Sequence, residues 1–281
     1  MKGILIFIAD VVPGISGGTF AFIMGIYERL IYAITKINIE NSKEFLLLLK
    51  KRNFKEFWNK FKELDFLFLF ILFLGIFSSI IFMSKVIHYL YETYTSFLLV
   101  FFIGLILGSI KIIYDDIPKH KLFNYMFGFG GFLLGISLLY LKELTQINPS
   151  FLMIFFSGFL AVTALFLPGI SGSFILLILG MYSFMLDILQ NIFSNLLSLG
   201  VFMLGALFGM IIISKTIYYL FSQDKSKTLY VLLGFVIGSL GILVRDSLPG
   251  ISLDNYMIHI GLGVFASIIV LTLSFISRGK K

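Results

Sequence analysis

The chain has 281 residues, of which 59% are hydrophobic and only 13% are charged. A soluble globular domain carries roughly 25% charged residues, so this composition indicates an integral membrane protein. The absence of cysteine and the three scattered histidines argue against disulfides, thiol chemistry, a metal site or a cofactor. The net charge of +7 is interpreted as a signature of orientation in the bilayer rather than of a nucleic-acid partner.

The N-terminal segment contains the sequence DVVPGISGGTFAFIMGIYER at 10–29. Only about ten residues precede its Pro-Gly pair, which is roughly 15 Å of helix against a hydrocarbon core of about 30 Å. An arm this short cannot cross the membrane. Residues 3–35 are therefore predicted to form a re-entrant hairpin whose tip is buried in protein.

The next segment, 36–63, has a different composition. It mixes leucine, phenylalanine and the single tryptophan with eight lysines or arginines between Lys36 and Lys62. This mixture is typical of an amphipathic segment on a membrane surface. We expect it to anchor and orient the protein.

Six apolar stretches are long enough, at about 20 residues each, to span a bilayer. They lie at 66–90, 94–114, 122–142, 196–221, 227–245 and 256–277. Between the third and fourth of them, residues 144–186 contain no charged residue, and the sequence PGISGS lies near the middle. A second re-entrant hairpin is predicted there, at 150–190.

The two hairpins belong to a longer internal repeat. At an offset of 155, positions 13–27 match positions 168–182 at eight of fifteen places. Further along the offset falls to 130, where Ser84-Lys85 matches Ser214-Lys215, and Gly104, Gly108 and Ser109 match Gly234, Gly238 and Ser239. The first repeat therefore comprises 1–121, including the insertion 36–63, together with the span 122–142, and the second repeat comprises 144–281.

Each repeat contains one hairpin and three spans, so the second repeat is predicted to be inverted relative to the first. With 36–63 in the cytoplasm, 17 basic residues lie inside and 3 lie outside, and both termini are cytoplasmic. The positive-inside rule favours this orientation. Inverted repeats with interrupted helices that meet near the midplane are typical of secondary transporters, with the binding site at the breaks.

The chemistry of the breaks indicates an anion. Glycine and proline stop one helix and the next begins at once, so its free N–H groups and positive dipole end point at the tip. Phosphate or carboxylate is the natural ligand of such an end. The alternative is that Pro-Gly only kinks a transmembrane helix.

The sequences ADVVPGISGGTFAFIMGIYERLI and PGISGSFILLILGMY, with the paired Ser-Lys and GxxxGS segments, resemble the DUF368 membrane proteins, the polyprenyl-phosphate transporter family, over essentially the whole chain. This resemblance implies a flippase of the bacterial cytoplasmic membrane. Its substrate would be undecaprenyl phosphate or a related polyprenyl phosphate, returned from the outer to the inner leaflet for carrier-lipid recycling in cell-wall synthesis. The implied phosphate-binding residues lie in the two tips, Pro13 to Thr19 and Pro168 to Ser173: Pro13, Gly14, Ser16, Gly17, Gly18, Thr19, Pro168, Gly169, Ser171, Gly172 and Ser173.

Four charged residues outside the tips complete the expected site. Arg29 is predicted to assist head-group binding, and Asp10 to titrate if transport is coupled to protons; the alternative is a structural role at the interface. Lys85 and Lys215 are predicted to supply counter-charges on opposite sides of the midplane, against the alternative that each snorkels to its nearest interface. No catalytic residue is expected.

Two other functions remain open from the sequence. Membrane pyrophosphate phosphatases also use re-entrant hairpins and a PGxSRSG signature, but here Gly17 and Gly172 follow the serines where that signature has arginine. A phosphoryl-transfer site needs cationic stabilisation that neither tip supplies locally. A helix N-terminus does not identify its anion, so another small-anion carrier or a channel is the second alternative.

Overall fold

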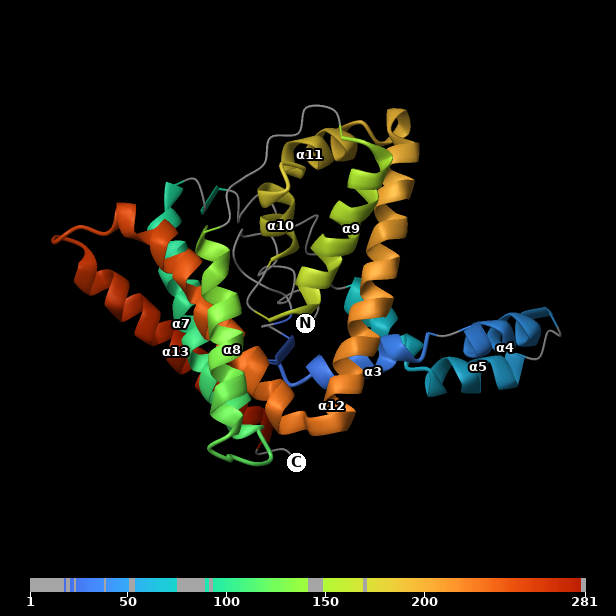
Figure 1. Ribbon diagram of the computed structural model, residues 1–281, viewed down its shortest axis with the longest axis horizontal. Helices are drawn as coiled ribbons and strands as arrows, with labels where there is room; N and C mark the ends of the chain where they lie inside the picture. Colours follow the sequence, from blue (N-terminus) through green and yellow to red (C-terminus); the bar gives the residue numbers. More distant parts are fainter. Residues whose placement is uncertain are drawn as a thin grey trace.

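The computed structural model describes residues 18, 21–22, 24–37, 39–50, 54–74, 89–90, 93–140, 149–168 and 171–278 (Figure 1). Every regular element in this part of the chain is a helix, which confirms the all-helical prediction. The α-helices are α3 (Tyr27–Thr35), α4 (Ile39–Lys50), α5 (Phe54–Glu63), α7 (Thr95–Asp115), α8 (Asn124–Ser137), α9 (Phe151–Phe166), α10 (Gly172–Ile178), α11 (Tyr182–Gln190), α12 (Leu196–Ser247) and α13 (Tyr256–Arg278). Short 3-10 helices follow α8, α11 and α12, and residues 66–74 are also helical.

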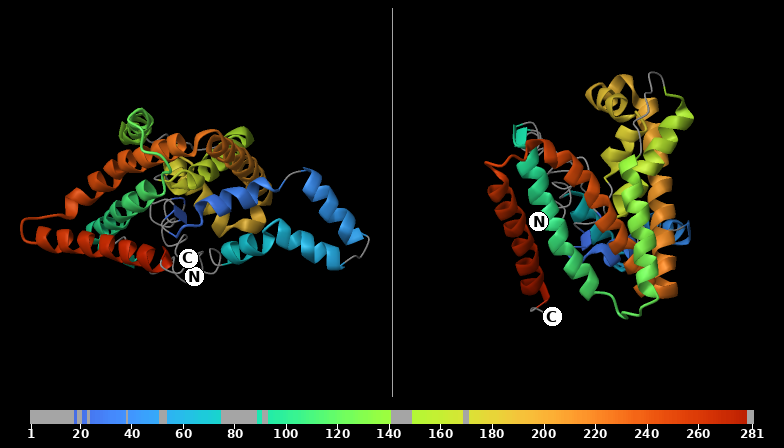
Figure 2. Two further views of the ribbon diagram at one scale, coloured as in Figure 1. Left: turned by 90° about the horizontal axis from the view of Figure 1, so that it is seen from below. Right: turned by 60° about the vertical axis from the view of Figure 1, so that its left-hand side comes forward.

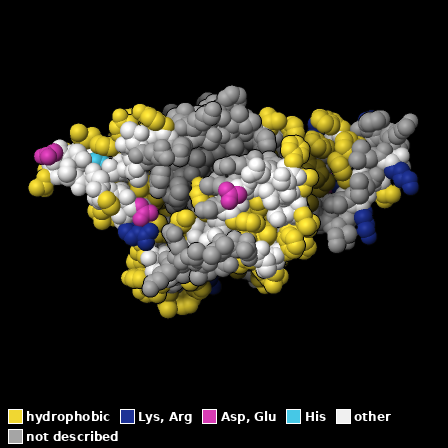
Figure 3. Space-filling model, turned by 90° about the horizontal axis from the view of Figure 1, so that it is seen from above, with side chains coloured by type: hydrophobic (Ala, Val, Ile, Leu, Met, Phe, Trp, Pro, Cys, Tyr) yellow, Lys and Arg dark blue, Asp and Glu magenta, His cyan; other side chains and the backbone are white. Residues whose placement is uncertain are grey.

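The outer surface of the helices is apolar. Among the described helices, α7 and the stretch Leu196–Gly250 are long and apolar enough to cross a bilayer, with mean hydropathies of 2.4 and 2.5. Large apolar side chains such as Phe129, Phe208 and Phe265 are more than half exposed, and Figure 3 shows hydrophobic side chains over much of the described surface. A soluble monomer rarely exposes apolar surface on this scale, so the chain is a membrane protein.

Helix α12 is bent at Asp224, where φ is −157° and ψ is 94°. The Asp224 carboxylate accepts a hydrogen bond from the backbone N–H of Lys227 at 3.0 Å, which is the N-cap geometry that starts a new helix. The bend divides α12 into two arms, 196–223 and 225–247, which cover the predicted spans 196–221 and 227–245. The spans are thus joined through a capped kink rather than a loop.

Close packing through glycine joins α7 to α13. A Cβ atom at Gly108 would lie 2.9 Å from the Ser267 carbonyl oxygen, and one at Gly104 would overlap the carbonyl group of Gly263. The Ser267 hydroxyl also donates to the Gly104 carbonyl at 2.7 Å. Small residues let the two backbones approach this closely, as in membrane helix pairs generally.

The second arm of α12 packs on α8 by the same contact. Cβ atoms at Gly234 and Gly238 would overlap the carbonyl groups of Gly128 and Phe132. Gly234 and Gly238 of α12 lie 130 positions after Gly104 and Gly108 of α7. The residues that they contact are related in a similar way: Gly263 and Ser267 of α13 lie 135 positions after Gly128 and Phe132 of α8. Figures 1 and 2 show the two pairs, α7 with α13 and α8 with α12. Helices separated widely in the chain thus make one repeated contact.

The insertion 36–63 folds into two helices, α4 and α5, which project from the helical body (Figure 1). The Phe45 ring of α4 lies 4.4 Å from the ring of Phe57, and Lys60 forms an ion pair with Glu44 at 2.8 Å. Each helix therefore covers part of the apolar face of the other. That the pair lies on a membrane surface stays a prediction.

Helices also occupy most of the remaining predicted spans. Helix α7 covers 94–114, α8 with its 3-10 helix covers most of 122–142, and α13 covers 256–277. The span 66–90 is helical at 66–74 and 89–90, and its other residues lie outside the described part of the chain. Most of the predicted first hairpin, 3–35, also lies outside it before residue 24. The division of these helices into inverted repeats stays a prediction.

Candidate functional site

The tip of the second hairpin lies between α9 and α10. Helix α9 ends at Phe166, and Pro168, which cannot donate a backbone hydrogen bond, follows within two residues. Ser171 is fully buried and caps α10: its hydroxyl accepts from the Phe174 N–H at 3.4 Å. The hydroxyl oxygens of Ser171 and Ser173 are 2.5 Å apart. Two predicted site residues thus place their hydroxyl groups side by side at this tip.

Gly172 is required where α10 folds back along α9. A Cβ atom on Gly172 would lie 2.7 Å from the Ala161 carbonyl oxygen, a distance that real Cβ atoms essentially never show. The neighbour is helix backbone, which cannot rotate away as a flexible side chain could. The close approach of the two helices therefore fixes glycine at this position.

The same turn occurs at Gly25 and Gly180, in the segments of the two predicted hairpins. Gly25 and Gly180 have φ values of 62° and 67°, and they are 155 positions apart. The N–H of Gly25 bonds to the Phe22 carbonyl, and the N–H of Gly180 bonds to the Leu177 carbonyl, at 2.8 and 2.9 Å. In both turns the next residue bonds back to the carbonyl five positions earlier, which completes a Schellman motif. The sequence repeat is thus also a repeat of backbone conformation at this turn.

Tyr27, the first residue of α3, contacts the end of α9. It is almost completely buried, its ring stacks on Phe22 at 3.9 Å, and its hydroxyl donates to the Phe166 carbonyl at 2.8 Å. Phe166 is the last residue of α9, immediately before the second tip. A buried hydroxyl without a partner would be costly, so this bond holds α3 against the end of α9.

Among the described residues near this tip, two buried hydroxyl groups have no hydrogen-bond partner: Thr163 Oγ1 on α9 and Ser214 Oγ on the first arm of α12. Ser214 lies one helical turn before Ile217, which shares a buried core with Tyr27 and Phe166. Unpaired buried hydroxyl groups are rare, and each of these two can still donate one hydrogen bond. Thr163 was not among the predicted site residues, and its polarity in a largely apolar stretch was the only signal for it in the sequence.

Lys215 and Ser214 lie on different faces of α12. Ser214 is fully buried, whereas the Lys215 side chain is exposed. Consecutive helical residues are turned by about 100°, so the Ser-Lys pair does not point into one cavity as a unit. The role of Lys215 as a counter-charge stays a prediction.

Arg29 is held by Asp65. Its Nε and Nη2 atoms each lie 2.7 Å from a carboxylate oxygen of Asp65, and its guanidinium group lies 4.3 Å from the centre of the Phe68 ring. Lys36 donates to the Glu63 carbonyl at 2.6 Å beside it. These contacts fasten α3 to the base of the α4–α5 pair. To bind a head group, as predicted, Arg29 would have to exchange this carboxylate for the phosphate.

We expect Asp65→Asn to lower stability slightly, because the ion pair is partly exposed and such pairs contribute about 0.2–1 kcal/mol. Asparagine tolerates the left-handed backbone at this position, where φ is 59°. The hydrogen bonds from Arg29 hold the pKa of Asp65 below its usual range, so its contribution is present above the unfolded-state pKa, about 3.9, and is lost as the pH falls through the folded-state pKa.

The measurement is the difference in thermal unfolding midpoint between wild type and Asp65→Asn across pH. The difference should be constant from about pH 7 to pH 5 and should shrink below about pH 4. Asp254→Asn, an exposed aspartate before α13, is the control. A difference that persisted unchanged at low pH would contradict the ion-pair explanation.

Several predicted site residues lie outside the described residues: Asp10, Pro13, Gly14, Ser16, Gly17, Thr19, Lys85 and Gly169. Gly18 is helical and buried. Within the described part of the chain, no group of three histidine, aspartate or glutamate side chains is placed to hold a metal ion.

Comparison with known proteins gives a match over most of the chain. A family model described as undecaprenyl phosphate translocase-like matches residues 6–249. A polyprenyl-phosphate transporter of Vibrio cholerae is 36% identical over 240 residues, which cover 85% of this chain and 75% of the relative. A polyprenyl-phosphate transporter of Staphylococcus aureus is 30% identical over 280 residues, covering 94% and 90% of the two chains. No solved structure gives a significant match.

Proposed function

Because the chain belongs to the undecaprenyl phosphate translocase-like family, we propose that it is a membrane transporter that carries a polyprenyl phosphate between the leaflets of the bilayer. The observation that carries this proposal is the family match over residues 6–249, which includes both hairpin motifs. The two curated relatives bear names of the same meaning, and the apolar exterior of the helices agrees with a lipid substrate.

An inverted-repeat architecture is part of the proposal. It is supported by the Schellman turns at Gly25 and Gly180 and by the repeated glycine contact of α7 with α13 and of α12 with α8. In both glycine contacts the second span of one repeat packs on the third span of the other. Such reciprocal packing is what a two-fold relation between the repeats would produce.

The phosphate is proposed to bind where the two hairpins meet. The paired hydroxyl groups of Ser171 and Ser173 and the unpaired hydroxyl groups of Thr163 and Ser214 support this location. The bond from Tyr27 to Phe166 brings the first hairpin to the second. Hydroxyl groups can donate to a phosphate without adding charge to the apolar interior.

The proposed direction is from the outer to the inner leaflet of a bacterial cytoplasmic membrane, with both termini in the cytoplasm. The α7–α8 connection and the kink of α12 lie at one end of the molecule (Figure 1) and carry four lysines, Lys119, Lys121, Lys225 and Lys227. The positive-inside rule supports a cytoplasmic location for that end.

The proposal is tested by reconstituting the protein in vesicles that contain undecaprenyl phosphate. The fraction of the lipid in each leaflet is followed with and without proton and sodium gradients. Protein-dependent movement between leaflets is expected, and lipid distributions equal to those of protein-free vesicles would refute transport.

A parallel assay addresses the enzymatic alternative. Undecaprenyl pyrophosphate is supplied and the release of phosphate is measured. We expect none, since the described tip residues include no cation next to Ser171. Release of phosphate with no leaflet movement would favour a phosphatase, and uptake of a soluble anion instead would favour a small-anion carrier.

Lys85 and Lys215 are expected to act on opposite faces of the membrane. Lys85→Ala should weaken capture of head groups from the outer leaflet, and Lys215→Ala should weaken binding on the cytoplasmic side, each by about tenfold, because a charge-assisted contact to phosphate is lost. Head-group binding is measured from each face of oriented vesicles. Lys111→Ala, which removes a lysine paired with Asp115 at 2.7 Å, is the control. Equal affinities in both variants and wild type would mean that the lysines only snorkel.

A further inference from the structure

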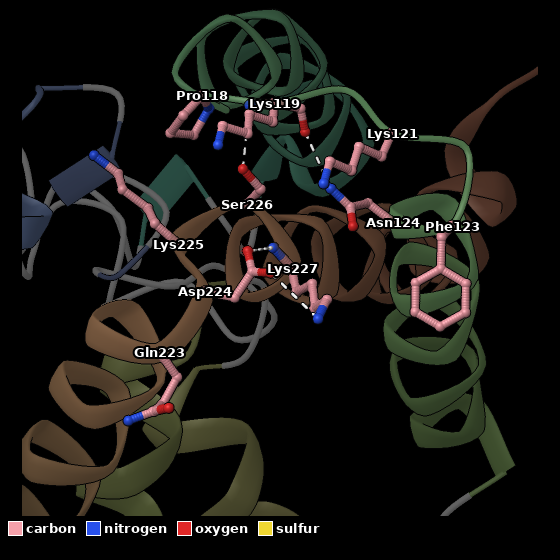
Figure 4. Close-up of a pocket in the computed structure, with 10 residues that line it drawn as sticks. All are labelled: Pro118, Lys119, Lys121, Phe123, Asn124, Gln223, Asp224, Lys225, Ser226 and Lys227. Carbon is pink, nitrogen blue, oxygen red and sulfur yellow. Dashed lines mark hydrogen bonds and ion pairs between the residues drawn. The ribbon is translucent and has the colours of Figure 1, made fainter.

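A polar cavity of about 430 Å³ lies where the α7–α8 connection meets the kink of α12 (Figure 4). Its basic side chains come from two places in the chain. Lys119 and Lys121 belong to the connection, and Lys225 and Lys227 begin the second arm of α12. Its size falls in the range of small-molecule sites, about 300–1,000 Å³.

One hydrogen bond joins the two sides of the cavity, and a second holds the α7–α8 side in place. The backbone N–H of Lys119 donates to the buried Ser226 hydroxyl at 3.1 Å, and the Asn124 side chain donates to the Lys119 carbonyl at 3.1 Å. Asp224 caps the arm from which Ser226 projects. The four lysines therefore start from a fixed backbone, which lowers the ordering cost of binding.

The charge of the cavity is strongly positive. The backbone N–H of Lys227 lowers the pKa of Asp224, so this carboxylate is ionised and lies 3.3 Å from the Lys227 ammonium group. Lys225 pairs with Glu28 of α3 at 2.7 Å. Lys119 and Lys121 have no ion pair among the described residues and are exposed. Four lysines against the carboxylates of Asp224 and Glu28 leave a net positive charge that suits an anion.

At the equivalent position of the sequence repeat, a serine also joins a helix to a connection, but no lysines accompany it. Ser96, which precedes Ser226 by 130 positions, contacts the Gly250 carbonyl at 3.5 Å and His259 at 3.0 Å. The residues 130 positions before Lys225 and Lys227 are Thr95 and Phe97, and the connection 248–255 contains no lysine or arginine. The basic cavity is therefore a feature of one end and is not imposed by the repeated fold.

We propose that this cavity is a second phosphate site, which binds the phosphate monoester head group of the lipid after it leaves the hairpin tips. The site rests on the proposed function, because that function supplies the lipid. Lysine ammonium groups hold phosphate as mobile point charges, which permits release as well as capture. Glu28, one position after Tyr27 in α3, forms the ion pair with Lys225, and the arriving phosphate displaces the Glu28 carboxylate.

Lysine footprinting on the full-length protein in neutral detergent tests the site. The rate of acetylation of each lysine by an amine-reactive reagent is measured by mass spectrometry with farnesyl phosphate, farnesol, inorganic phosphate or phosphatidylglycerol. Farnesyl phosphate should slow the labelling of Lys119 and Lys121 about tenfold and leave the exposed Lys43 and Lys50 of α4 unchanged. Farnesol should protect none of them.

The other probes identify the source of the phosphate. If inorganic phosphate protected the lysines and farnesyl phosphate at the same concentration did not, the cavity would be a site for the free anion. If phosphatidylglycerol protected them as well as farnesyl phosphate does, the cavity would be a site for bulk lipid. Either result overturns the proposal. Equal slowing at Lys43 and Lys50 also overturns it.

A variant pair separates this site from the transport function. Lys119→Gln with Lys121→Gln should lower the transport rate about tenfold, whereas Lys43→Gln with Lys50→Gln removes the same charge from α4 and should leave it unchanged. If Lys119→Gln with Lys121→Gln transported at the wild-type rate and farnesyl phosphate did not protect the two lysines, the second phosphate site would be refuted and the proposed function would stand. Absence of transport by the wild-type protein would refute the function itself.

Discussion

Gly172→Leu is expected to lower the transport rate roughly ten- to hundredfold while the protein still reaches the membrane. A Cβ atom at this position would lie 2.7 Å from the Ala161 carbonyl oxygen, so α10 must move away from α9. The movement displaces Ser171 and Ser173, which place their hydroxyl groups at the tip. Overpacking costs about 1–3 kcal/mol, which corresponds to roughly a ten- to hundredfold loss in transport rate.

The measurement is the initial rate of leaflet movement in vesicles with matched amounts of protein. Gly130→Leu on α8 is the matched control, because no atom lies within 4 Å of a Cβ atom there. Gly172→Ala adds a single carbon at the crowded position and should lie between wild type and the leucine variant. Wild-type rates for Gly172→Leu would refute a role for this tip in transport.

Gly234→Leu and Gly104→Leu are expected to destabilise the protein to a similar extent. A side chain at either position enters the backbone of the partner helix, α8 in one case and α13 in the other. Neither backbone can yield without separating a helix pair, so we expect the thermal unfolding midpoint to fall by roughly 5–10 °C.

The controls are glycines on the two partner helices. Gly130 on α8 and Gly261 on α13 have open space where a Cβ atom would lie, so leucine at either should change the midpoint little. Unfolding is followed by the loss of helical circular dichroism in detergent. A large effect at Gly234 with none at Gly104 would show that the two contacts are not equivalent.

The helical elements could be predicted from the sequence because apolar runs and Pro-Gly breaks are local signals. Helices α7 and α13 follow their predicted ranges closely, and the break after Phe166 is followed at once by a helix that Ser171 caps. The identical turns at Gly25 and Gly180 were visible as matching glycines at an offset of 155.

Contacts between distant residues could not be predicted. The partner of Arg29 is 36 positions away, and only the folded α4–α5 pair brings Asp65 to it. The same holds for the pairing of α4 with α5, which depends on Phe45 meeting Phe57. Sequence periodicity describes one helix at a time and carries no information about which neighbour covers it.

The basic cavity shows the same limit for a site. Its lysines lie in the sequences PKHK and DKSK, which by themselves indicate only orientation in the membrane. Their convergence depends on the contact between Lys119 and Ser226, which are 107 positions apart. A cluster assembled from two connections becomes a site only once the fold is known.

The reciprocal glycine contacts have a consequence for biogenesis. Gly104 of α7 packs against Gly263 of α13, so about 160 further residues must be synthesised and inserted before this glycine face of α7 is covered. Contacts so far apart in the chain form late and slowly. During that interval α13 does not yet cover the α7 glycine face, and a chain that stops before α13 leaves this contact unmade. Helix α13 therefore acts as the closing element of this helix pair.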